Sequence, residues 1–345
     1  MRIRSLLLTA VLVLASSPAS AGPISALYVF GDSLSDNGNL SAIAEAIVPG
    51  PGPTIPASPY APGRASNGPL AVEYLAQSLG LAPLLPAAVG GTNFAVIGAA
   101  TGPVPLPGAP GTTADNSSAL LGLPLPVPTG ISTGQLAQFF AMQPGPIDAD
   151  ALFVIWGGPN DVLINPSEAT AVQAASNIGT AVDTLYAAGA RRFLVPNMPD
   201  LGLAPGAGAD ALALTQLTLL FNTQLAGNLA TREGLPDMQL TPFDAFALFN
   251  AIVMNPALYG LTNIDDACVQ GNVLSAVRVC GLDDEAGYLF WDDAHPTTVG
   301  HKVLGGGFAE AISPDAEVPE PATLTLLGLG LTGIGSRRWR RRQAC

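Results

Sequence analysis

Two histidines, His295 and His301, occur in this chain of 345 residues, so a histidine base working at neutral pH must be one of them. The segment Asp292-Asp293-Ala294-His295 puts a carboxylate three residues before the first imidazole. Asp292 could then accept the Nδ1 proton of His295 and leave Nε2 free to take a proton from a hydroxyl. The spacing therefore predicts a general base. The alternative is that Asp292 or Asp293 caps a following helix and leaves His295 exposed.

A hydroxyl that could serve this base lies near the other end of the chain. Ser33 belongs to Gly31-Asp32-Ser33-Leu34, directly after the apolar run Ala26-Leu27-Tyr28-Val29-Phe30. A serine at a strand-to-loop turn can face a crevice, and the N–H groups of a following helix can face an oxyanion. The position suits a nucleophile, whereas a turn serine or a helix N-cap is the simpler interpretation of the tetrapeptide alone.

Further apolar runs indicate the framework that would position these residues. One covers 152–156 and ends at Gly157-Gly158, and another covers 193–195 and ends at Pro196. Such runs are typical of strands buried on both faces of a parallel sheet. Helical periodicity occurs between and after them, at 72–79, 135–140, 169–188, 211–230 and 297–312. Alternating strands and helices predict a doubly wound, three-layer α/β sheet.

The site is expected at one edge of this sheet. Ligands of open parallel sheets bind beyond the carboxyl ends of the strands, and Ser33, Asn160 and Asp161 all follow apolar runs. The Pro- and Gly-rich stretch 102–130 predicts an irregular surface excursion of the same domain. We therefore expect one catalytic domain, residues 22–313.

Composition supports a compact, acidic domain. Apolar residues make up 48% of the chain and can supply a substantial core. Seven of the 13 basic residues lie in the two terminal segments, so the body between them is strongly acidic. That charge argues against binding nucleic acid through a basic surface. Cys268 and Cys280 could close a short disulfide loop or remain two free buried thiols.

The N-terminus has the features of a signal peptide, residues 1–21. Arg2 and Arg4 precede an apolar run at 6–15, and the small residues Ala19-Ser20-Ala21 suit cleavage by signal peptidase after Ala21. The apolar run is too short to span a bilayer, which disfavours the alternative of a membrane anchor or a first buried helix.

The C-terminal segment, 314–345, has the features of a second sorting signal. Val318-Pro319-Glu320-Pro321 leads into an apolar stretch, 322–335, and then into an arginine cluster. As a helix the stretch would be about 21 Å long, shorter than a hydrocarbon core of about 30 Å. The segment closely resembles the PEP-CTERM sorting signal of Gram-negative bacteria that make exopolysaccharide, in which the tail is held in the inner membrane and then processed. The resemblance implies an exosortase-type partner and an extracellular or cell-surface destination, and an ordinary tail anchor is the alternative.

Five blocks in the body resemble those of the GDSL, or SGNH, hydrolases, particularly the branch that includes plant GDSL lipases and bacterial haemolysin-like phospholipases. The blocks are Gly31-Asp32-Ser33-Leu34-Ser35-Asp36-Asn37-Gly38-Asn39, Gly63-Arg64-Ala65-Ser66-Asn67-Gly68 with Glu73-Tyr74-Leu75-Ala76, Asn93-Phe94-Ala95 with Gly98, Gly158-Pro159-Asn160-Asp161, and Phe290-Trp291-Asp292-Asp293-Ala294-His295-Pro296-Thr297 followed by His301. Their joint occurrence in this order makes the resemblance specific.

The resemblance implies a three-layer α/β/α, flavodoxin-like SGNH-hydrolase fold with a central, mostly parallel sheet of about five strands. It also implies that Ser33 is the nucleophile. The oxyanion donors would be the Ser33 N–H, the Gly98 N–H and the Asn160 side-chain amide. We expect glycine at 98 because a side chain would obstruct close backbone approach. The alternative for Asn160 is an ordinary turn residue.

Roles for the remaining polar residues follow from the same resemblance. Asp292 and His295 complete the catalytic group, and Asp32 and Asp161 are candidate supporting residues. His301 is expected to be structural, because no carboxylate lies upstream of it at a comparable spacing.

The motifs together predict an exported serine esterase or lipase that forms an acyl-enzyme on Ser33, with no metal or organic cofactor. Its substrate would be a lipid, short-chain or polysaccharide acyl ester. One alternative is a non-catalytic surface binding protein on the same fold. Another is a metal-dependent phosphoesterase. Its ligands would come from Asp32, Asp36, Asp161, Asp292, His295 and His301.

Overall fold

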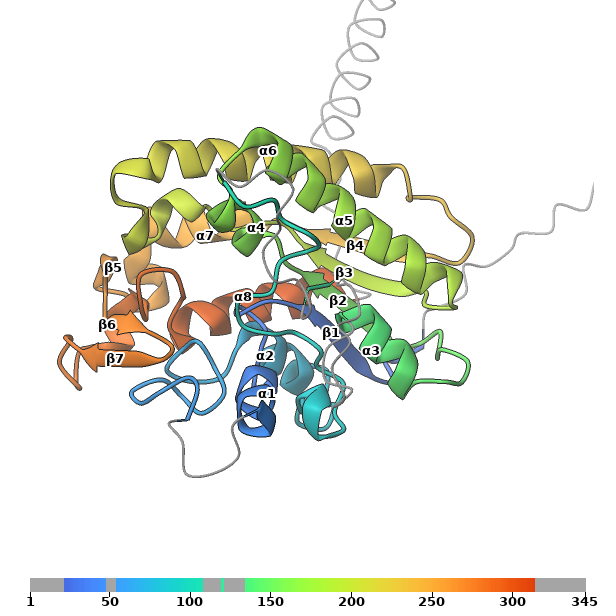
Figure 1. The fold of residues 1–345 in the computed structure, drawn as a ribbon, viewed down its shortest axis with the longest axis horizontal. Coiled ribbons are helices and arrows are strands. Elements are labelled where there is room, and N and C mark those ends of the chain that lie inside the picture. Colours follow the sequence, from blue (N-terminus) through green and yellow to red (C-terminus); the bar gives the residue numbers. More distant parts are fainter. Residues whose placement is uncertain (1–21, 48–53, 108–118, 121–133, 314–345) are drawn as a thin grey trace, which may run out of the picture.

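A central parallel sheet organises the computed structural model, which describes residues 22–47, 54–107, 119–120 and 134–313 (Figure 1). The sheet has four strands in the order β1-β2-β3-β4. They are β1 (Leu27–Gly31), β2 (Leu152–Trp156), β3 (Arg192–Pro196) and β4 (Gln239–Phe243). Gly31 pairs with Trp156, and Pro196 pairs with Phe243, so the carboxyl ends of the strands lie along one edge.

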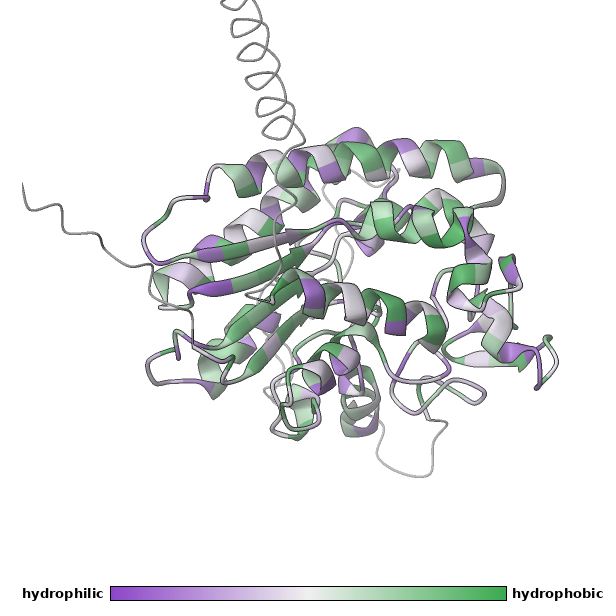
Figure 2. Ribbon diagram, turned by 180° about the vertical axis from the view of Figure 1, so that it is seen from behind, coloured by the Kyte–Doolittle hydropathy of each residue, from purple (hydrophilic) through white to green (hydrophobic). Residues whose placement is uncertain are grey.

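The strands separate two apolar cores, because successive side chains of a strand point to opposite faces. In β2, Phe153 and Ile155 belong to the first core, whereas Leu152, Val154 and Trp156 belong to the second. Every residue of β2 is buried. In Figure 2 the strands are coloured mainly as hydrophobic, as expected for a sheet covered on both faces.

Helices cover both faces of the sheet and give the predicted three layers (Figure 1). The first core is covered by α3 (Gln135–Met142), α5 (Glu168–Ala187) and α6 (Ala211–Ala230), and the second by α2 (Ala71–Ser78), α7 (Ala245–Met254) and α8 (Thr298–Ala311). Two further helices, α1 (Asn39–Ile47) and α4 (Pro159–Ile164), follow β1 and β2. The α/β/α fold is confirmed, and the predicted helices begin and end within two residues of the observed ones.

The sheet in the described residues has four strands, one fewer than the resemblance implied. The fifth place, beside β1, is occupied by the segment 92–96, which pairs only irregularly. The Phe94 N–H donates to the Val29 carbonyl at 2.7 Å, and Val29 and Asn93 form an isolated bridge. The Gly31 N–H, which a regular parallel ladder would direct to the Phe94 carbonyl, donates instead to Oε1 of Gln135 at 2.8 Å.

A smaller β region follows α7. It consists of β5 (Asn263–Ala267) parallel to β8 (Tyr288–Phe290), and of the antiparallel hairpin β6 (Val269–Asn272) and β7 (Ser275–Arg278). A disulfide joins Cys268 to Cys280 at the base of this hairpin. A third core packs beneath it and consists of Tyr60, Cys268, Val269, Cys280 and Trp291.

Some predictions fall outside the described residues. These are the signal peptide, 1–21, the PEP-CTERM segment, 314–345, and most of the irregular stretch 102–130. Among the residues that the structure does describe, no helix combines the length and the apolar character needed to cross a membrane.

Candidate active site

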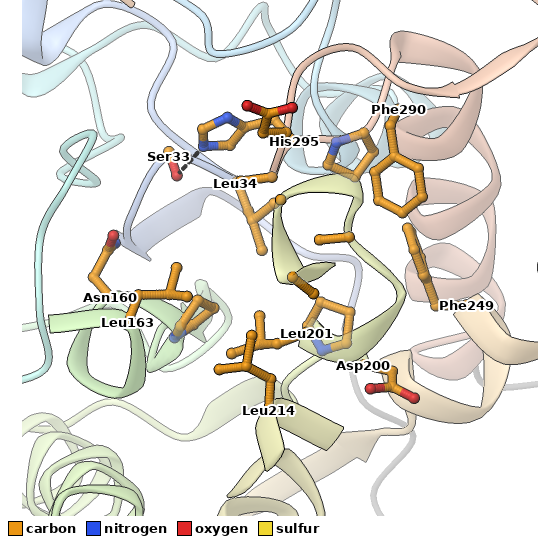
Figure 3. Close-up of a pocket in the computed structure, with 18 residues that line it drawn as sticks. Ser33, Leu34, Asn160, Leu163, Asp200, Leu201, Leu214, Phe249, Phe290 and His295 are labelled. Atoms are coloured by element: carbon orange, nitrogen blue, oxygen red, sulfur yellow. Dashed lines mark hydrogen bonds between the residues drawn. The ribbon is translucent and has the colours of Figure 1, made fainter. Parts of the chain in front are cut away.

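Ser33, His295 and Asp292 meet beyond the carboxyl end of β1, and Figure 3 shows the bond between Ser33 and His295. His295 Nε2 lies 2.8 Å from Ser33 Oγ, and His295 Nδ1 lies 2.8 Å from Oδ2 and 2.9 Å from Oδ1 of Asp292. A carboxylate beside Nδ1 favours the tautomer whose proton is on Nδ1, which leaves Nε2 to accept from the serine hydroxyl. The helix-cap alternative is wrong, because the N-cap of α8 is Thr297 and Asp292 bonds to N–H groups that precede the helix.

Asp292 is held in place from several directions. Its Oδ1 accepts from the N–H groups of Ala294 at 2.8 Å and His295 at 2.7 Å, and its Oδ2 accepts from the Tyr60 hydroxyl at 2.6 Å. Burial raises the pKa of Asp292, but the charge of His295 and these hydrogen bonds outweigh burial, so the pKa lies below its ordinary value. Asp292 is therefore an ionised, oriented partner for the imidazole.

The contact with Asp292 also sets the pKa of His295. Burial lowers the pKa of the imidazole, but the Asp292 carboxylate raises it by charge and by hydrogen bonding, with a smaller contribution from Asp32. The net pKa is above its ordinary value of about 6.5. The neutral form that can accept a proton from Ser33 therefore dominates only at correspondingly higher pH.

Tyr60 is a site residue that sequence analysis missed. It lies 232 residues before Asp292, and its ring is 6.1 Å from the ring of Trp291 in an edge-on arrangement. The residue is 5% exposed, so its hydroxyl needs a buried acceptor, and Asp292 provides one. The available signal was its position three residues before Gly63, where the second block begins.

The second block holds the last block in place. The Ser66 hydroxyl donates to the Pro296 carbonyl at 2.8 Å, and the Asn67 side chain accepts from the Thr298 N–H at 2.7 Å. The Arg64 guanidinium makes two bonds to the Glu73 carboxylate, at 2.6 and 2.7 Å, which fasten the block to α2. The chain on the C-terminal side of His295 is thus fixed by a distant part of the sequence.

Residues 96–99 form a loop, the Gly98 loop, that is hydrogen-bonded to the first block through Asp36 and to the fourth block through Asn160. The N–H groups on either side of Gly98 are used: Ile97 donates to Asp36 at 2.9 Å, and Ala99 donates to the Val96 carbonyl at 3.0 Å. Within the described part of the chain, the N–H groups of Gly98 and Ser33 have no acceptor. Two backbone donors are therefore available at this edge of the sheet.

The backbone conformation gives a further reason for glycine at position 98. Its φ is +81°, in the left-handed region that L side chains rarely adopt. A Cβ built on Gly98 would meet no atom of the described residues within 4 Å, so the space beside it is open. The obstruction of an approaching oxyanion by a side chain at this position stays a prediction.

Asn160 faces the same cavity as Ser33 and His295 (Figure 3). It lies in the first turn of α4, directly after Pro159. Its Nδ2 donates to the Ala99 carbonyl at 3.0 Å, which ties α4 to the Gly98 loop. A side-chain amide has two hydrogens, so one is engaged here and the second can meet a ligand.

Asp161 and Asp32 are both buried beside the site, and neither bonds to the Ser33 hydroxyl. Asp161 accepts from the Thr101 N–H at 2.9 Å and the Thr101 hydroxyl at 2.7 Å, and burial raises its pKa to about 6. Asp32 Oδ1 accepts from the Leu34 N–H at 3.0 Å, while Oδ2 is buried without a partner in the described residues. Burial raises the pKa of Asp32 to about 7, despite the opposing effects of Leu34 and His295.

The residues of the metal-dependent alternative are divided among separate networks. Asp36 accepts from four backbone N–H groups, and Asp161 is bonded to Thr101. His301 is fully buried in α8 and accepts from the Ala71 N–H at 3.3 Å. In the ranges that the structure describes, no three His, Cys, Asp or Glu side chains are placed to hold one ion.

A three-layer α/β/α fold with a serine, histidine and aspartate beyond its first strand is the architecture of a hydrolase. The chain belongs to the GDSL-like lipase/acylhydrolase family, whose model matches residues 27–307. A PEP-CTERM protein-sorting motif matches residues 317–342. Both resemblances found in the sequence are confirmed, and the protein is a hydrolase with a sorting signal for export.

Relatives come from plants and bacteria. A GDSL esterase/lipase of Arabidopsis thaliana is 30% identical, with 89% of this chain and 86% of the relative aligned. A thermolabile hemolysin of Vibrio parahaemolyticus is 26% identical, with 85% of this chain and 65% of the relative aligned. A phosphatidylcholine-sterol acyltransferase of Aeromonas hydrophila is 25% identical, with 85% of this chain and 91% of the relative aligned.

Proposed function

We propose that the protein is an exported serine hydrolase of carboxylic esters, with Ser33 as nucleophile, His295 as general base and acid, and Asp292 as the orienting carboxylate. The observation that supports this most directly is the 2.8 Å separation of Ser33 Oγ and His295 Nε2. Family membership supports the same reaction class.

In the first half-reaction, Ser33 Oγ attacks the ester carbonyl carbon while its proton moves to His295 Nε2. The tetrahedral intermediate collapses when the bond to the alcohol oxygen breaks, and His295 gives its proton to that oxygen. The alcohol leaves and the acyl group remains on Ser33. Asp292 stays ionised throughout and stabilises the imidazolium.

In the second half-reaction, water replaces the alcohol. His295 takes one water proton as the hydroxyl attacks the acyl carbon, and it returns the proton to Ser33 Oγ when the carboxylic acid departs. During both steps the oxyanion would accept from the Ser33 N–H, the Gly98 N–H and the Asn160 amide. Removing one such donor typically costs about 3 to 4 kcal/mol of transition-state stabilisation.

Export would proceed in two cuts. Signal peptidase would remove residues 1–21, and an exosortase-type enzyme would process the segment 314–345 after the tail has been held in the inner membrane. The product would be the domain 22–313, outside the cell or on its surface. Mass spectrometry of the protein recovered from an exporting host measures both ends, and an intact Met1 or Cys345 on the surface protein would contradict this processing.

Covalent labelling tests the catalytic assignment. A fluorophosphonate probe should label the wild-type protein on Ser33 and leave Ser33→Ala unlabelled. Ser35→Ala is the matched control, because it removes a buried hydroxyl from the same loop that has no hydrogen-bond partner in the described residues. It should retain both labelling and hydrolysis of p-nitrophenyl butyrate.

The alternatives give different results in the same assay. A non-catalytic binding protein would be neither labelled nor active. A metal-dependent phosphoesterase would lose activity with a chelator and keep it after phosphonate treatment. Residual turnover of Ser33→Ala above about a tenth of the parental rate would contradict a nucleophilic role.

A further inference from the structure

Gln135 is a buried polar residue that the reaction proposed above does not use. It is 1% exposed and lies at the start of α3, whose Leu136 and Phe139 belong to the first core. Its side-chain Oε1 accepts from the Gly31 N–H at 2.8 Å, and its Nε2 donates to the Gly31 carbonyl at 2.7 Å. The Gln135 amide thus binds both polar groups of the last residue of β1, as a neighbouring strand would.

Aromatic packing fixes the helix that carries Gln135. Phe139 lies one turn further along α3, on the same face as Gln135. Its ring packs edge-on against Phe30 and Phe94, at 5.6 and 5.7 Å between ring centroids. Phe30 directly precedes Gly31 in β1, so α3 lies beside the end of this strand (Figure 1). The Gln135 side chain is therefore presented to Gly31 from a rigid support.

The bonds to Gly31 act on Ser33 through a short connection. Gly31 ends β1, and only Asp32 separates it from Ser33. The Asp32 carbonyl accepts from the N–H groups of Ser35 at 3.0 Å and Asp36 at 2.9 Å, so the chain turns tightly around Ser33. Because this turn is closed by its own hydrogen bonds, a shift of the Gly31 peptide would move the Ser33 hydroxyl and the Ser33 N–H with it.

Gln135 also restrains the Gly98 loop. The Gly31 carbonyl accepts from the Val96 N–H, at 3.2 Å, as well as from Gln135, so the loop and α3 meet at one oxygen. A second connection runs through the main chain. The segment 119–120 accepts from the Gln135 N–H at 3.0 Å and donates to the Ala100 carbonyl at 3.1 Å. One residue is therefore bonded both to the strand that leads to the nucleophile and to the chain that follows the Gly98 loop.

We propose that Gln135 is a positioning residue for catalysis, which holds the Gly31 peptide so that the Ser33 hydroxyl and the N–H groups of Ser33 and Gly98 keep their relative positions. Misplacement of a reacting group by about 1 Å can lower a rate by about 10²-fold. The nucleophile and the oxyanion donors bind most strongly in the transition state, so their misplacement lowers kcat and leaves KM nearly unchanged. This inference rests on the nucleophilic role proposed for Ser33.

Gln135→Met tests the proposal, because it removes both side-chain bonds and keeps the length of the side chain. With p-nitrophenyl butyrate, kcat should fall about 30- to 300-fold while KM changes by less than about threefold. Circular dichroism should show a folded protein, and the fluorophosphonate probe should label every molecule on Ser33 with a rate constant reduced by a similar factor. A purely structural role would instead lower the folded and labelled fraction and leave the rate constant of the folded molecules unchanged.

Gln135→Glu provides a second measurement that does not depend on the folding of the methionine variant. A neutral carboxyl has an acceptor oxygen and an O–H donor, so it can make both bonds to Gly31, whereas the carboxylate has lost its donor. Burial raises the pKa of a carboxyl at this position, so the neutral form is present at low pH. The kcat of Gln135→Glu should be within about fivefold of wild type at pH 6, and the ratio should fall as the pH rises toward 9.

Gln138→Met is the matched control, since Gln138 is half-buried on the same helix and receives the same substitution. It should leave kcat and the labelling rate within about twofold of wild type. Equal effects of the two methionine variants, an unchanged kcat for Gln135→Met, or a kcat for Gln135→Glu at pH 6 as low as that of Gln135→Met would overturn the positioning role and leave ester hydrolysis standing. A wild-type protein without hydrolysis and with Ser33 unlabelled would overturn the proposed function and this inference with it.

Discussion

The two histidines lie six residues apart and differ in nearly every physical respect. His295 lies in the loop between β8 and α8, with the Asp292 carboxylate on one ring nitrogen and the Ser33 hydroxyl on the other. His301 lies inside α8, fully buried, with one ring nitrogen accepting from the Ala71 N–H. Burial and the nearby His295 lower the pKa of His301 to about 3, whereas the pKa of His295 is raised.

The difference shows that a charged partner, not burial, decides what each imidazole can do. Burial lowers the pKa of both rings, and only His295 has a carboxylate that outweighs it. His301 stays neutral throughout the physiological range, so it cannot shuttle protons there. Residue type alone would not have separated the two.

The largest expected effect contrasts the two histidines directly. His295→Gln should lower kcat for p-nitrophenyl butyrate by at least about 10⁴-fold, because the serine loses its base. His301→Gln should lower kcat by less than about fivefold when assayed folded. Comparable losses from the two variants, with unchanged circular dichroism, would break the distinction.

Removing the carboxylate should make His295 more like His301. Asp292→Asn is expected to lower kcat by about 10³- to 10⁴-fold, because the amide favours the wrong tautomer and no longer stabilises the imidazolium. The matched control is Asp283→Asn, which changes an exposed carboxylate of the same C-terminal region. A loss of less than about tenfold for Asp292→Asn would show that another group orients the ring.

The pH dependence of the free energy of unfolding tests the buried histidine, His301. The pKa of His301 is about 6.5 unfolded and about 3 folded, so its contribution to stability is complete above pH 6.5 and declines as pH falls toward 3. Between pH 7 and pH 5 this loss amounts to about 2 kcal/mol of the free energy of unfolding. His301→Gln removes that contribution, so its urea unfolding should weaken less over the same interval. Parallel curves for both proteins would show that His301 is protonated in the folded state.

The smallest expected effect concerns the Tyr60 hydroxyl, which donates a hydrogen bond to Asp292. Tyr60→Phe should lower kcat by about tenfold with little change in KM, because one donor to the orienting carboxylate is lost. Tyr60 holds the pKa of Asp292 down, and without it the carboxylate would interact more strongly with His295. The acid limb of the kcat/KM profile should therefore move to higher pH.

Tyr259→Phe provides the control for that shift, since Tyr259 packs against the second core and is not among the hydrogen-bond partners of Asp292. An acid limb that stays in place for Tyr60→Phe, or moves equally for Tyr259→Phe, would show that the hydroxyl has no specific role.

Much of the fold could be predicted because its signals are local. The five consecutive apolar residues of β2 predict a strand buried on both faces, and the structure buries all of them. Asp292 and His295 could be paired because only two residues separate them. These two inferences needed only periodicity and short spacing. The place of Ser33 directly after a strand made it a candidate, and the family resemblance gave it the role of nucleophile.

The remaining features depend on contacts between distant segments. Tyr60 reaches Asp292 across 232 residues, and no spacing rule connects them. The segment 92–96 pairs only irregularly with β1, because the Gln135 side chain takes the Gly31 N–H that a regular ladder would use. Glycine at 98 was expected so that a ligand could approach its N–H, and the left-handed backbone conformation there adds a second reason. Each depends on how loops pack, which sequence patterns do not record.

The proton-transfer pair spans two units of unequal size. Ser33 follows a strand of the large central sheet, whereas the Asp292 loop is supported by the small third core, with Tyr60 and Trp291. Small cores open at lower free energy than large ones. As the urea concentration increases, catalytic activity should therefore be lost before the helices unfold. At intermediate concentrations the protein would keep its helices and be inactive. Coincident loss of turnover and of the far-ultraviolet signal would instead show that both units unfold together.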